Sequence, residues 1–333
     1  MKEVDKVIGN SEKRDMASHL LRNNNNLVSD IMTNKDPLNS LSAGYKNKTR
    51  AFVEIQNGCN HRCTFCVIPY GRGNLRSKPK EQIIIEINDL ISKGHKEIIL
   101  TGVDIASWNM ENQNESSLGV LIEYILNKIP NLERLRLSSM DIIGFDEKLI
   151  ELIANNKRIL PHIHLSLQSG DNLILKRMKR RHLREDAIEL CKELKQRRPE
   201  ISFGADLIVG FPTETEEMFQ NTLNIVEECQ LDWIHAFPFS PRPGTPAAKM
   251  PQNDTKIIKQ RSKVLREVAR KRKKSYLENL VGKSIEVFVE KDNKGYSNQF
   301  APIKLIEKNI ESGQTITALI KTSDENFAHG VAI

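Results

Sequence analysis

The sequence has no long hydrophobic run and very few cysteines. No apolar stretch in its 333 residues reaches the roughly 18 residues that a membrane-spanning helix needs, and the amino terminus lacks the apolar core of a secretory signal. Only five cysteines occur, three of them between positions 59 and 66, whereas secreted disulfide scaffolds spread more cysteines over shorter chains. These absences predict a cytoplasmic protein with no membrane partner, in which the clustered cysteines bind metal.

Several widespread catalytic signatures are also missing. The chain has no phosphate-binding P-loop, no G-x-G-x-x-G after an expected strand and no Ser-His-Asp constellation. Nucleoside triphosphatases, dinucleotide-dependent dehydrogenases and serine hydrolases are therefore poor interpretations of this sequence.

Positive charge is concentrated in one segment. Residues 256–274 contain ten Lys or Arg and one acid, Glu267, so this segment carries +9 while the whole chain carries +7. Such an excess indicates a polyanionic partner, with nucleic acid as the first candidate. A merely solvated helix face is the alternative that charge alone leaves open.

The order of expected elements divides the chain into four parts. Residues 1–48 contain an asparagine run and turn residues and are expected to form a linker. Residues 49–252 alternate between strands and helices, 253–279 form a basic helix, and 280–333 show the alternating pattern of a small all-β domain. Expected strands are 51–55, 97–101, 134–137, 162–167, 202–209 and 233–239, and expected helices are 80–92, 117–128, 146–155, 172–180, 184–197 and 215–228.

Six strand–helix repeats predict an α/β fold with a parallel sheet and helical crossovers. Continuously apolar strand interiors, such as residues 98–100 and 207–209, are typical of strands buried on both faces. An open doubly wound sheet and a partial barrel both fit this pattern, and both place functional groups at the carboxyl ends of the strands.

The chemistry is carried by Cys59, Cys63 and Cys66, which have the spacing C-x3-C-x2-C in the loop after the first expected strand. Three thiolates from one loop can hold three irons of a 4Fe–4S cluster. The open fourth iron can then chelate S-adenosylmethionine, whose reductive cleavage yields a 5′-deoxyadenosyl radical. The alternatives are a structural zinc ion, with His61 as a fourth ligand, and three unconnected buried thiols. Cys191 and Cys229 fall inside expected amphipathic helices and are predicted to be inert core residues.

This loop, with Phe65 before its third cysteine, resembles the cluster loop of the radical-SAM superfamily. More narrowly, the chain is similar to the tRNA methylthiotransferases, and most similar to the subgroup that modifies threonylcarbamoyladenosine. The resemblance implies a partial (β/α)6 radical-SAM barrel followed by a small RNA-binding β domain called TRAM. The matching stretches are 59–77, 100–104, 136–139, 164–170, 206–215 and 237–246.

The same resemblance implies roles for residues at the strand ends. Gly102 and Asp104 would accommodate the methionine amino group, Ser166 and Gln168 would hydrogen-bond the ribose, and Asp206 and Val209 would border the adenine, with Phe65 also beside the cofactor. His162, His164 and His235 are expected to be packed, hydrogen-bonded residues rather than catalysts. The side chains expected to face tRNA phosphates are Arg72, Lys176, Arg177, Arg180, Arg270, Arg272 and Lys273.

The expected reaction is radical-SAM transfer of a methylthio group to C2 of threonylcarbamoyladenosine beside the tRNA anticodon. Alternatives are an isopentenyladenosine-directed enzyme, a catalytically incomplete tRNA-binding remnant and a zinc-containing RNA-binding module. Members of this family carry a second 4Fe–4S cluster on an N-terminal domain, and no cysteine here precedes Cys59. Residues 1–48 are therefore expected to be a remnant of that domain; either its cluster comes from a separately made N-terminal piece, or the sequence is a truncated form. A flavodoxin-type protein is the expected electron donor.

Overall fold

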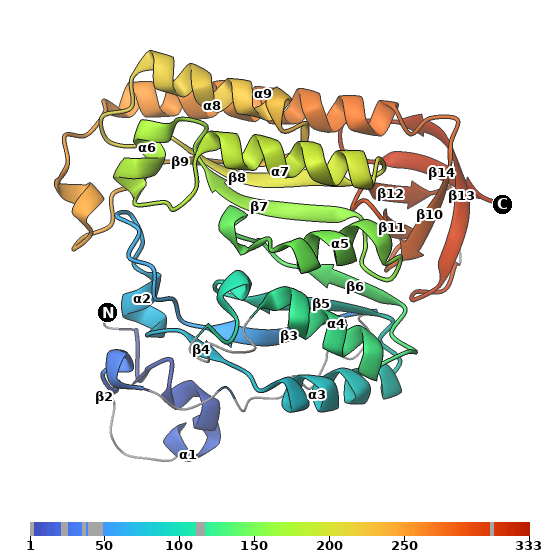
Figure 1. Cartoon of the computed structure of the whole chain (residues 1–333), viewed down its shortest axis with the longest axis horizontal. Coiled ribbons are helices and arrows are strands. Elements are labelled where there is room, and N and C mark those ends of the chain that lie inside the picture. The colour runs from blue at the N-terminus through green and yellow to red at the C-terminus, as the bar shows by residue number, and fades with distance from the viewer. Residues whose placement is uncertain (1–2, 21–25, 35–37, 39–48, 111–116, 307–309) are drawn as a thin grey trace.

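The computed structural model describes residues 3–20, 26–34, 38, 49–110, 117–306 and 310–333 (Figure 1). Within these ranges the main body is an incomplete barrel of six parallel strands. In order around the barrel these are β3 (Arg50–Asn57), β5 (Glu97–Gly102), β6 (Arg134–Leu137), β7 (His162–Gln168), β8 (Ser202–Val209) and β9 (Leu231–Pro238).

The barrel consists of two sheets that are joined at one seam and open at the other. Strands β3, β5 and β6 pair in parallel, as do β7, β8 and β9. Isolated parallel bridges, Leu135 with Ile159 and Met140 with Leu165, connect the two sheets. The short strand β4 (Arg76–Ser77) runs antiparallel beside β3. Of the two predicted architectures, the structure therefore confirms the partial barrel.

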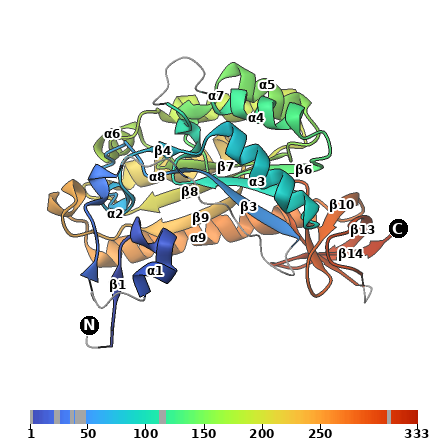
Figure 2. The ribbon, with the colours of Figure 1, turned by 90° about the horizontal axis from the view of Figure 1, so that it is seen from below.

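Helices cover the outer face of this barrel (Figures 1 and 2). Four of them begin at residues whose side-chain oxygens accept backbone N–H groups of the first turn, namely Ser117, Asp146, Asp171 and Thr215. The helices are α3 (Lys80–Ser92), α4 (Leu118–Lys128), α5 (Glu147–Asn155), α6 (Asn172–Met178), α7 (Arg184–Arg197) and α8 (Glu216–Glu228).

Strand alternation divides the side chains between an outer core and an inner face. On β7, Ile163, Leu165 and Leu167 are buried in the hydrophobic core beneath the helices. The intervening His164 and Ser166 must therefore point to the inside of the barrel, where polar groups can meet a ligand. Cys191 and Cys229 belong to the outer core, which confirms their prediction.

The C-terminal part contains a long helix, α9 (Thr255–Glu278), and a closed five-stranded barrel. Helix α9 lies alongside β9 and α8. The small barrel lies at the amino ends of the six parallel strands (Figure 1). Its strands, in order around the barrel, are β10 (Ser284–Val289), β11 (Lys294–Ser297), β12 (Pro302–Leu305), β14 (Ala328–Ala332) and β13 (Thr315–Ser323).

A buried ion-pair network joins the two barrels. The Glu97 carboxylate accepts one hydrogen bond from Arg134 Nε at 2.9 Å and one from Arg136 Nε at 2.8 Å. Arg136 also donates to the backbone oxygens of Ser297 and Asn298, both at 3.0 Å. The network therefore closes the amino-terminal end of the large barrel with a loop of the small one.

The described N-terminal residues form short elements near α2 (Ile68–Arg72). Strand β1 (Val7–Ile8) pairs in parallel with β2 (Asn26–Leu27), and helix α1 (Met16–Leu20) lies between them in sequence. Single 3-10 turns are η1 (Glu12–Asp15), η2 (Ile31–Thr33), η3 (Ile105–Ser107), η4 (Ile142–Gly144) and η5 (Pro246–Lys249). Residues 1–2, 21–25, 35–37 and 39–48 of the expected linker, which include the asparagines at 23–25, lie outside the described residues. No helix in the described ranges is long and apolar enough to cross a membrane.

Candidate active site

The three clustered cysteines lie on a loop that leaves the carboxyl end of β3. The loop begins at Gly58, whose φ of +73° favours glycine. A Cβ atom there would lie 1.9 Å from the Asn74 carbonyl oxygen, so only glycine fits this close approach. The Cys59 N–H then donates to the Gly73 carbonyl at 3.1 Å, which closes the base of the loop.

The tip of the loop is attached to the opposite half of the barrel. The Thr64 N–H donates to Met178 O at 3.1 Å, and the Thr64 hydroxyl donates to Arg177 O at 2.7 Å. The Phe65 ring meets Phe211 edge-on, with 6.5 Å between centroids. These contacts hold the cysteines over the carboxyl ends of the strands, the end at which parallel barrels place their chemistry.

A cavity of about 190 Å³ lies beneath this loop. The structure brings most of the predicted cofactor residues together around it, although the lining comes from five separate segments. It is lined by Cys59, His61, Cys63, Phe65, Cys66, Ile68, Val103, Asp104, Ser139, Asp141, Ser166, Gln168 and Arg180.

The spacing and environment of the thiols fit a multi-iron cluster better than one zinc ion. Among the described residues, no group of ligand atoms within 4.8 Å of one another contains all three sulfurs. A tetrahedral zinc ion with Zn–S bonds of about 2.3 Å would need sulfurs about 3.8 Å apart, whereas a cubane offers three separate irons. Burial raises the pKa of the Cys59 thiol to about 11 and also raises that of Cys66, so metal binding must displace their protons.

His61 does not join all three cysteines in one ligand set, but its ligand atom lies within 4.8 Å of those of Cys59 and Asp104, a group that could hold a metal ion. Its Nε2 lies 2.9 Å from Asp104 Oδ2, and its backbone N–H donates to Cys59 Sγ at 3.4 Å. The imidazole therefore joins the cysteine loop to the loop after β5. This pairing was not predicted from the sequence, because the two residues are separated by 43 positions.

Gln56 is a buried residue that the sequence analysis missed. Its side-chain oxygen accepts the Asp104 N–H at 2.7 Å, and its amide nitrogen donates to Gly58 O at 2.6 Å. One side chain thus fixes the start of the cysteine loop and the Asp104 loop together. Its only sequence signal was its place three residues before Cys59.

Gly102 does not line the cavity, and its role is steric. A Cβ atom at this position would lie 2.6 Å from the Gln56 carbonyl oxygen and 2.9 Å from its side-chain oxygen. The predicted contact between Gly102 and the cofactor is therefore replaced by close packing of β5 on β3, which positions Asp104.

Changing Gly102 to Ala is expected to lower the free energy of unfolding by about 1–3 kcal/mol, because the added methyl group overpacks this site. It should also lower iron incorporation by displacing Asp104. Gly71→Ala is the matched control, since a Cβ there meets nothing within 4 Å. Urea unfolding and iron content test this, and equal values for the two variants would contradict the steric role.

Ser166 and Gln168 lie at the cavity from the end of β7. The Ser166 and Ser139 hydroxyls are 2.7 Å apart. Gln168 has a φ of +71°, a left-handed conformation that non-glycine residues rarely adopt, and it follows an irregularity in the pairing of β7 with β8. Strained backbone of this kind is common at ligand sites.

Arg180 lies in the cavity rather than among outward-facing cations, so its predicted position was wrong. Its guanidinium is 3.0 Å from Asp141 Oδ1, donates to Ser166 O at 2.8 Å and is 3.9 Å from Cys63 Sγ. Although burial opposes ionisation, the nearby His182, whose Nδ1 is 3.5 Å from Asp141 Oδ1, and the charges of Arg180 and Arg181 hold the pKa of Asp141 well below its usual range. Asp141 is a second cavity residue that the sequence analysis missed.

Two predicted adenine-side residues also lie elsewhere. Val209 is fully buried in the outer core, because the alternation of β8 points its side chain away from the inside; the neighbouring Ile208 takes the inner position. Asp206 does face inside, but it binds His164 and His235 rather than lining the cavity. The predicted adenine contact of Val209 was therefore wrong.

The basic helix is partly neutralised by acids of the same chain. Arg270 pairs with Glu267 and Glu325, and Arg272 contacts Glu227 at 3.0 Å. Both arginines therefore already have acidic partners, and their contact with tRNA phosphates stays a prediction.

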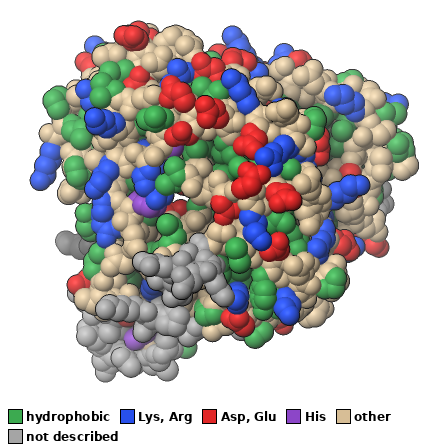
Figure 3. All heavy atoms as spheres, in the orientation of Figure 1, with side chains coloured by type: hydrophobic (Ala, Val, Ile, Leu, Met, Phe, Trp, Pro, Cys, Tyr) green, Lys and Arg blue, Asp and Glu red, His purple; other side chains and the backbone are tan. Residues whose placement is uncertain are grey.

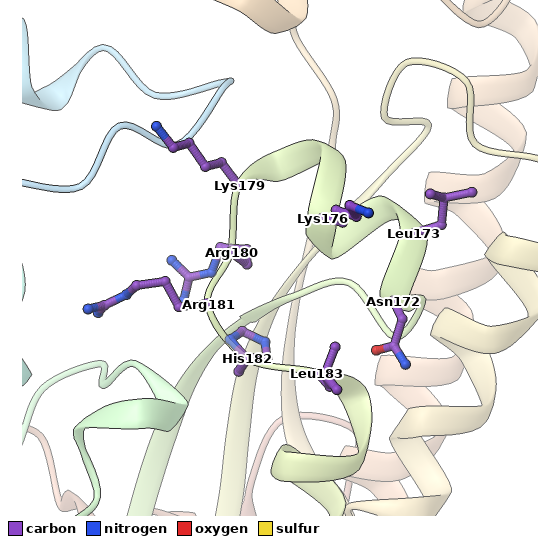
Figure 4. A pocket seen from close by; sticks show the side chains of 8 residues that line it. All are labelled: Asn172, Leu173, Lys176, Lys179, Arg180, Arg181, His182 and Leu183. Atoms are coloured by element: carbon purple, nitrogen blue, oxygen red, sulfur yellow. The ribbon is translucent and has the colours of Figure 1, made fainter.

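A second group of cations lies beside the cavity mouth on α6 and the turn after it. Lys176, Lys179 and Arg181 are exposed, and Figure 4 shows Lys179, Arg180 and Arg181 extending toward the same side. In Figure 3, several Lys and Arg side chains lie on the left part of the molecule, the part in which Figure 1 places α6 and the loop that contains η5. Arg177 instead donates to Thr213 O, and Arg72 lies in α2 next to the cysteine loop.

An incomplete parallel barrel with three cysteines on the loop after its first strand defines a radical SAM protein. Residues 53–226 match the family model described as the Radical SAM superfamily. Over 333 residues the chain is 43% identical to the threonylcarbamoyladenosine tRNA methylthiotransferase MtaB of Rickettsia prowazekii, covering all of this chain and 79% of that protein. The chain therefore belongs to the tRNA methylthiotransferase family of radical SAM proteins.

Two further similarities are more distant. The chain is 38% identical over 285 residues to the tRNA-2-methylthio-N(6)-dimethylallyladenosine synthase of Shouchella clausii, covering 83% of this chain and 54% of that one. The solved structure of the radical S-adenosylmethionine methyltransferase TsrM from Kitasatospora setae aligns with a TM-score of 0.49 and 19% identity, over 61% of this chain and 39% of that one.

Proposed function

We propose that this protein transfers a methylthio group to an adenosine of transfer RNA that carries a threonylcarbamoyl substituent. The observation that carries the proposal is the cysteine loop held over the carboxyl ends of an open barrel, in a chain 43% identical over its whole length to an enzyme of that name.

Cys59, Cys63 and Cys66 would hold the 4Fe–4S cluster, which when bound supplies the electron that cleaves S-adenosylmethionine to a carbon radical. The cavity residues would then orient the cofactor. Asp104, fixed by Gln56, offers a carboxylate for an ammonium group, and Arg180 offers a guanidinium for a carboxylate. The Ser166 hydroxyl and the Gln168 amide can hydrogen-bond a ribose, while Phe65 excludes water from one wall.

The sulfur source is proposed to lie on a partner. Of the five cysteines in the sequence, three form the site, and Cys191 and Cys229 are buried in the outer core. These two leave no second cluster set in this chain. A second iron–sulfur cluster would need ligands other than these five cysteines, and a flavodoxin-type protein would supply electrons.

The RNA is proposed to lie across α6 and the cavity mouth, with the closed C-terminal barrel as a TRAM-like RNA-binding domain. Changing Lys176, Lys179 and Arg181 together to Ala is expected to weaken transfer RNA binding about tenfold or more. The slope of log affinity against log salt should fall by roughly two to three, because fewer counterions are released.

The control for this triple variant removes three cations that pair with acids on the outer helices, Lys93, Lys148 and Arg197. Filter binding across a salt series measures both slopes. An unchanged slope in the α6 variant, or an equal loss in the control, would contradict the proposed RNA surface.

The proposed reaction is tested by nucleoside analysis. Anaerobically reconstituted protein, S-adenosylmethionine, a reductant and sulfide are incubated with anticodon stem-loop RNA carrying either threonylcarbamoyladenosine or isopentenyladenosine. A methylthio product from the first RNA and little from the second is expected. If only the RNA with isopentenyladenosine gives product, the protein acts on the substrate of the isopentenyladenosine subgroup. If neither RNA gives product, the proposal is contradicted.

A further inference from the structure

Three polar side chains on neighbouring strands form a cluster inside the barrel. One oxygen of Asp206 on β8 is 3.0 Å from His164 Nε2 on β7 and 2.9 Å from His235 Nδ1 on β9. The two imidazole rings are 4.7 Å apart between centroids. His164 precedes the cavity residue Ser166 by two positions on the same strand face, so the cluster lies about 7 Å deeper than the cavity.

The backbone of β8 is shaped to receive this cluster. Gly204 is paired with His164, and a Cβ atom on it would lie 2.4 Å from His164 Nδ1. The missing side chain lets the His164 ring lie over β8 and reach Asp206. The cluster is therefore built into the fold and does not result from surface side chains meeting by chance.

His235 is the member that a ligand can reach. Its side chain is 62% exposed, against 15% for His164 and 26% for Asp206, and β9 is the last strand beside the open seam. Phe237, on the same strand face, meets the His235 ring edge-on at 6.4 Å and is itself 48% exposed. Among the described residues, His235 Nε2 has no hydrogen-bond partner, so its free edge faces the open side of the barrel.

The charges of the cluster favour an anionic ligand. One Asp206 oxygen contacts both imidazoles, so the carboxylate is engaged within the cluster and the group left for a ligand is a ring nitrogen of His235. The hydrogen bond to Asp206 raises the pKa of His235. Although burial opposes ionisation, hydrogen bonds from both imidazoles hold the pKa of Asp206 well below its usual range. A protonated His235 offers Nε2–H as a charged donor.

We infer that His235, with Asp206 as its positioning residue, binds the carboxylate of an amino-acid substituent on the substrate adenosine and thereby selects substrates with an anionic side group. This inference rests on the proposed function. A threonylcarbamoyl group carries such a carboxylate, whereas a dimethylallyl group offers nothing for Nε2–H to bind. The exposed Phe237 ring beside it provides an aromatic surface for the attached base.

The test compares two anticodon stem-loop RNAs that differ only in this charge, one with threonylcarbamoyladenosine and one with its methyl ester. His235→Ala is expected to weaken binding of the acid, and to raise its KM, about tenfold to a hundredfold, as loss of a charged hydrogen bond predicts. Binding and turnover of the ester should change less than threefold. Asp206→Asn should shift the acid in the same direction, and His235→Lys should restore part of the preference.

The matched control is His329→Ala, which removes another imidazole paired with an aspartate, Asp324, on the small barrel. Equal losses for acid and ester, or an equal effect of His329→Ala, would overturn the inference. Zinc binding would also overturn the inference. If a variant with all three clustered cysteines changed to serine binds one zinc per chain, and the further change His235→Ala abolishes that binding, then His164, Asp206 and His235 form a metal site. If wild-type protein converts neither RNA, the proposed function fails; if it converts the acid and His235→Ala does so equally well, only this inference fails.

Discussion

Replacing Cys63 with serine is expected to lower the rate of S-adenosylmethionine cleavage at least about a thousandfold. The iron bound per chain should fall from about four to well below one. Among the described residues the three sulfurs do not all lie within 4.8 Å of one another, which suits three ligands to separate irons of one cluster. A serine hydroxyl is a poor replacement for a thiolate. The fold should survive, since Cys63 is only half-buried on a loop.

The control for this variant is Cys191→Ala, which removes a cysteine from the outer core while leaving the loop intact. It should keep its iron and its activity and lose only some stability. Iron analysis and the absorption of the reconstituted proteins measure the first effect. Full iron loading in Cys63→Ser would contradict the assignment of Cys63 as a ligand.

Changing Glu97 to Gln is expected to lower the free energy of unfolding by about 3–5 kcal/mol, because it leaves two buried arginines without their carboxylate. The side chains of Glu97, Arg134 and Arg136 are at most 5% exposed. Arg136 also carries the contact to the small barrel through Ser297. The loss should therefore affect both the large barrel and its junction with the small one.

The matched substitution for Glu97→Gln is Glu193→Gln, which breaks the exposed pair with Arg197 on α7 and should cost no more than about 1 kcal/mol. Urea unfolding compares the two. A loss below about 1 kcal/mol for Glu97→Gln would show that the network contributes little beyond packing.

Local patterns in the sequence were sufficient to predict most strands and helices of the large barrel. The predicted bounds of α3 and α7, and of β6 and β8, agree with the structure, because hydrophobic periodicity and strand interiors are properties of neighbouring residues. The three cysteines could be predicted as one site for the same reason, because they are neighbours on a single loop.

The wrong predictions concern the direction in which a side chain points and the residues, distant in sequence, that contact it. Val209 was predicted to border the adenine, but the alternation of side chains along β8 directs it into the outer core. Arg180 was grouped with the exposed cations that precede it, whereas the chain turns at Lys179, in the left-handed region, and directs Arg180 toward Asp141. The two partners are 39 positions apart, and no local pattern records such a pairing.

A run of charged residues in the sequence likewise does not reveal which of its side chains form contacts with distant parts of the chain. Residues 256–274 are strongly basic, yet Arg261 is buried against Glu214, and Arg270 and Arg272 meet acids from other elements. A run of like charges predicts a partner for that charge, and the partner can be the protein itself. Lys176 on α6 and Lys179 directly after it remain exposed beside the cavity, whereas the exposed Arg181 pairs with Asp141 at 3.3 Å.

The most direct test of this account measures 5′-deoxyadenosine formed by the reconstituted full chain, with S-adenosylmethionine and a reductant, in the presence and absence of anticodon stem-loop RNA carrying threonylcarbamoyladenosine. We predict 5′-deoxyadenosine in the wild type, more of it with RNA, and none in Cys63→Ser. No 5′-deoxyadenosine from wild-type protein that holds about four irons would contradict the assignment of this cavity as a radical SAM active site.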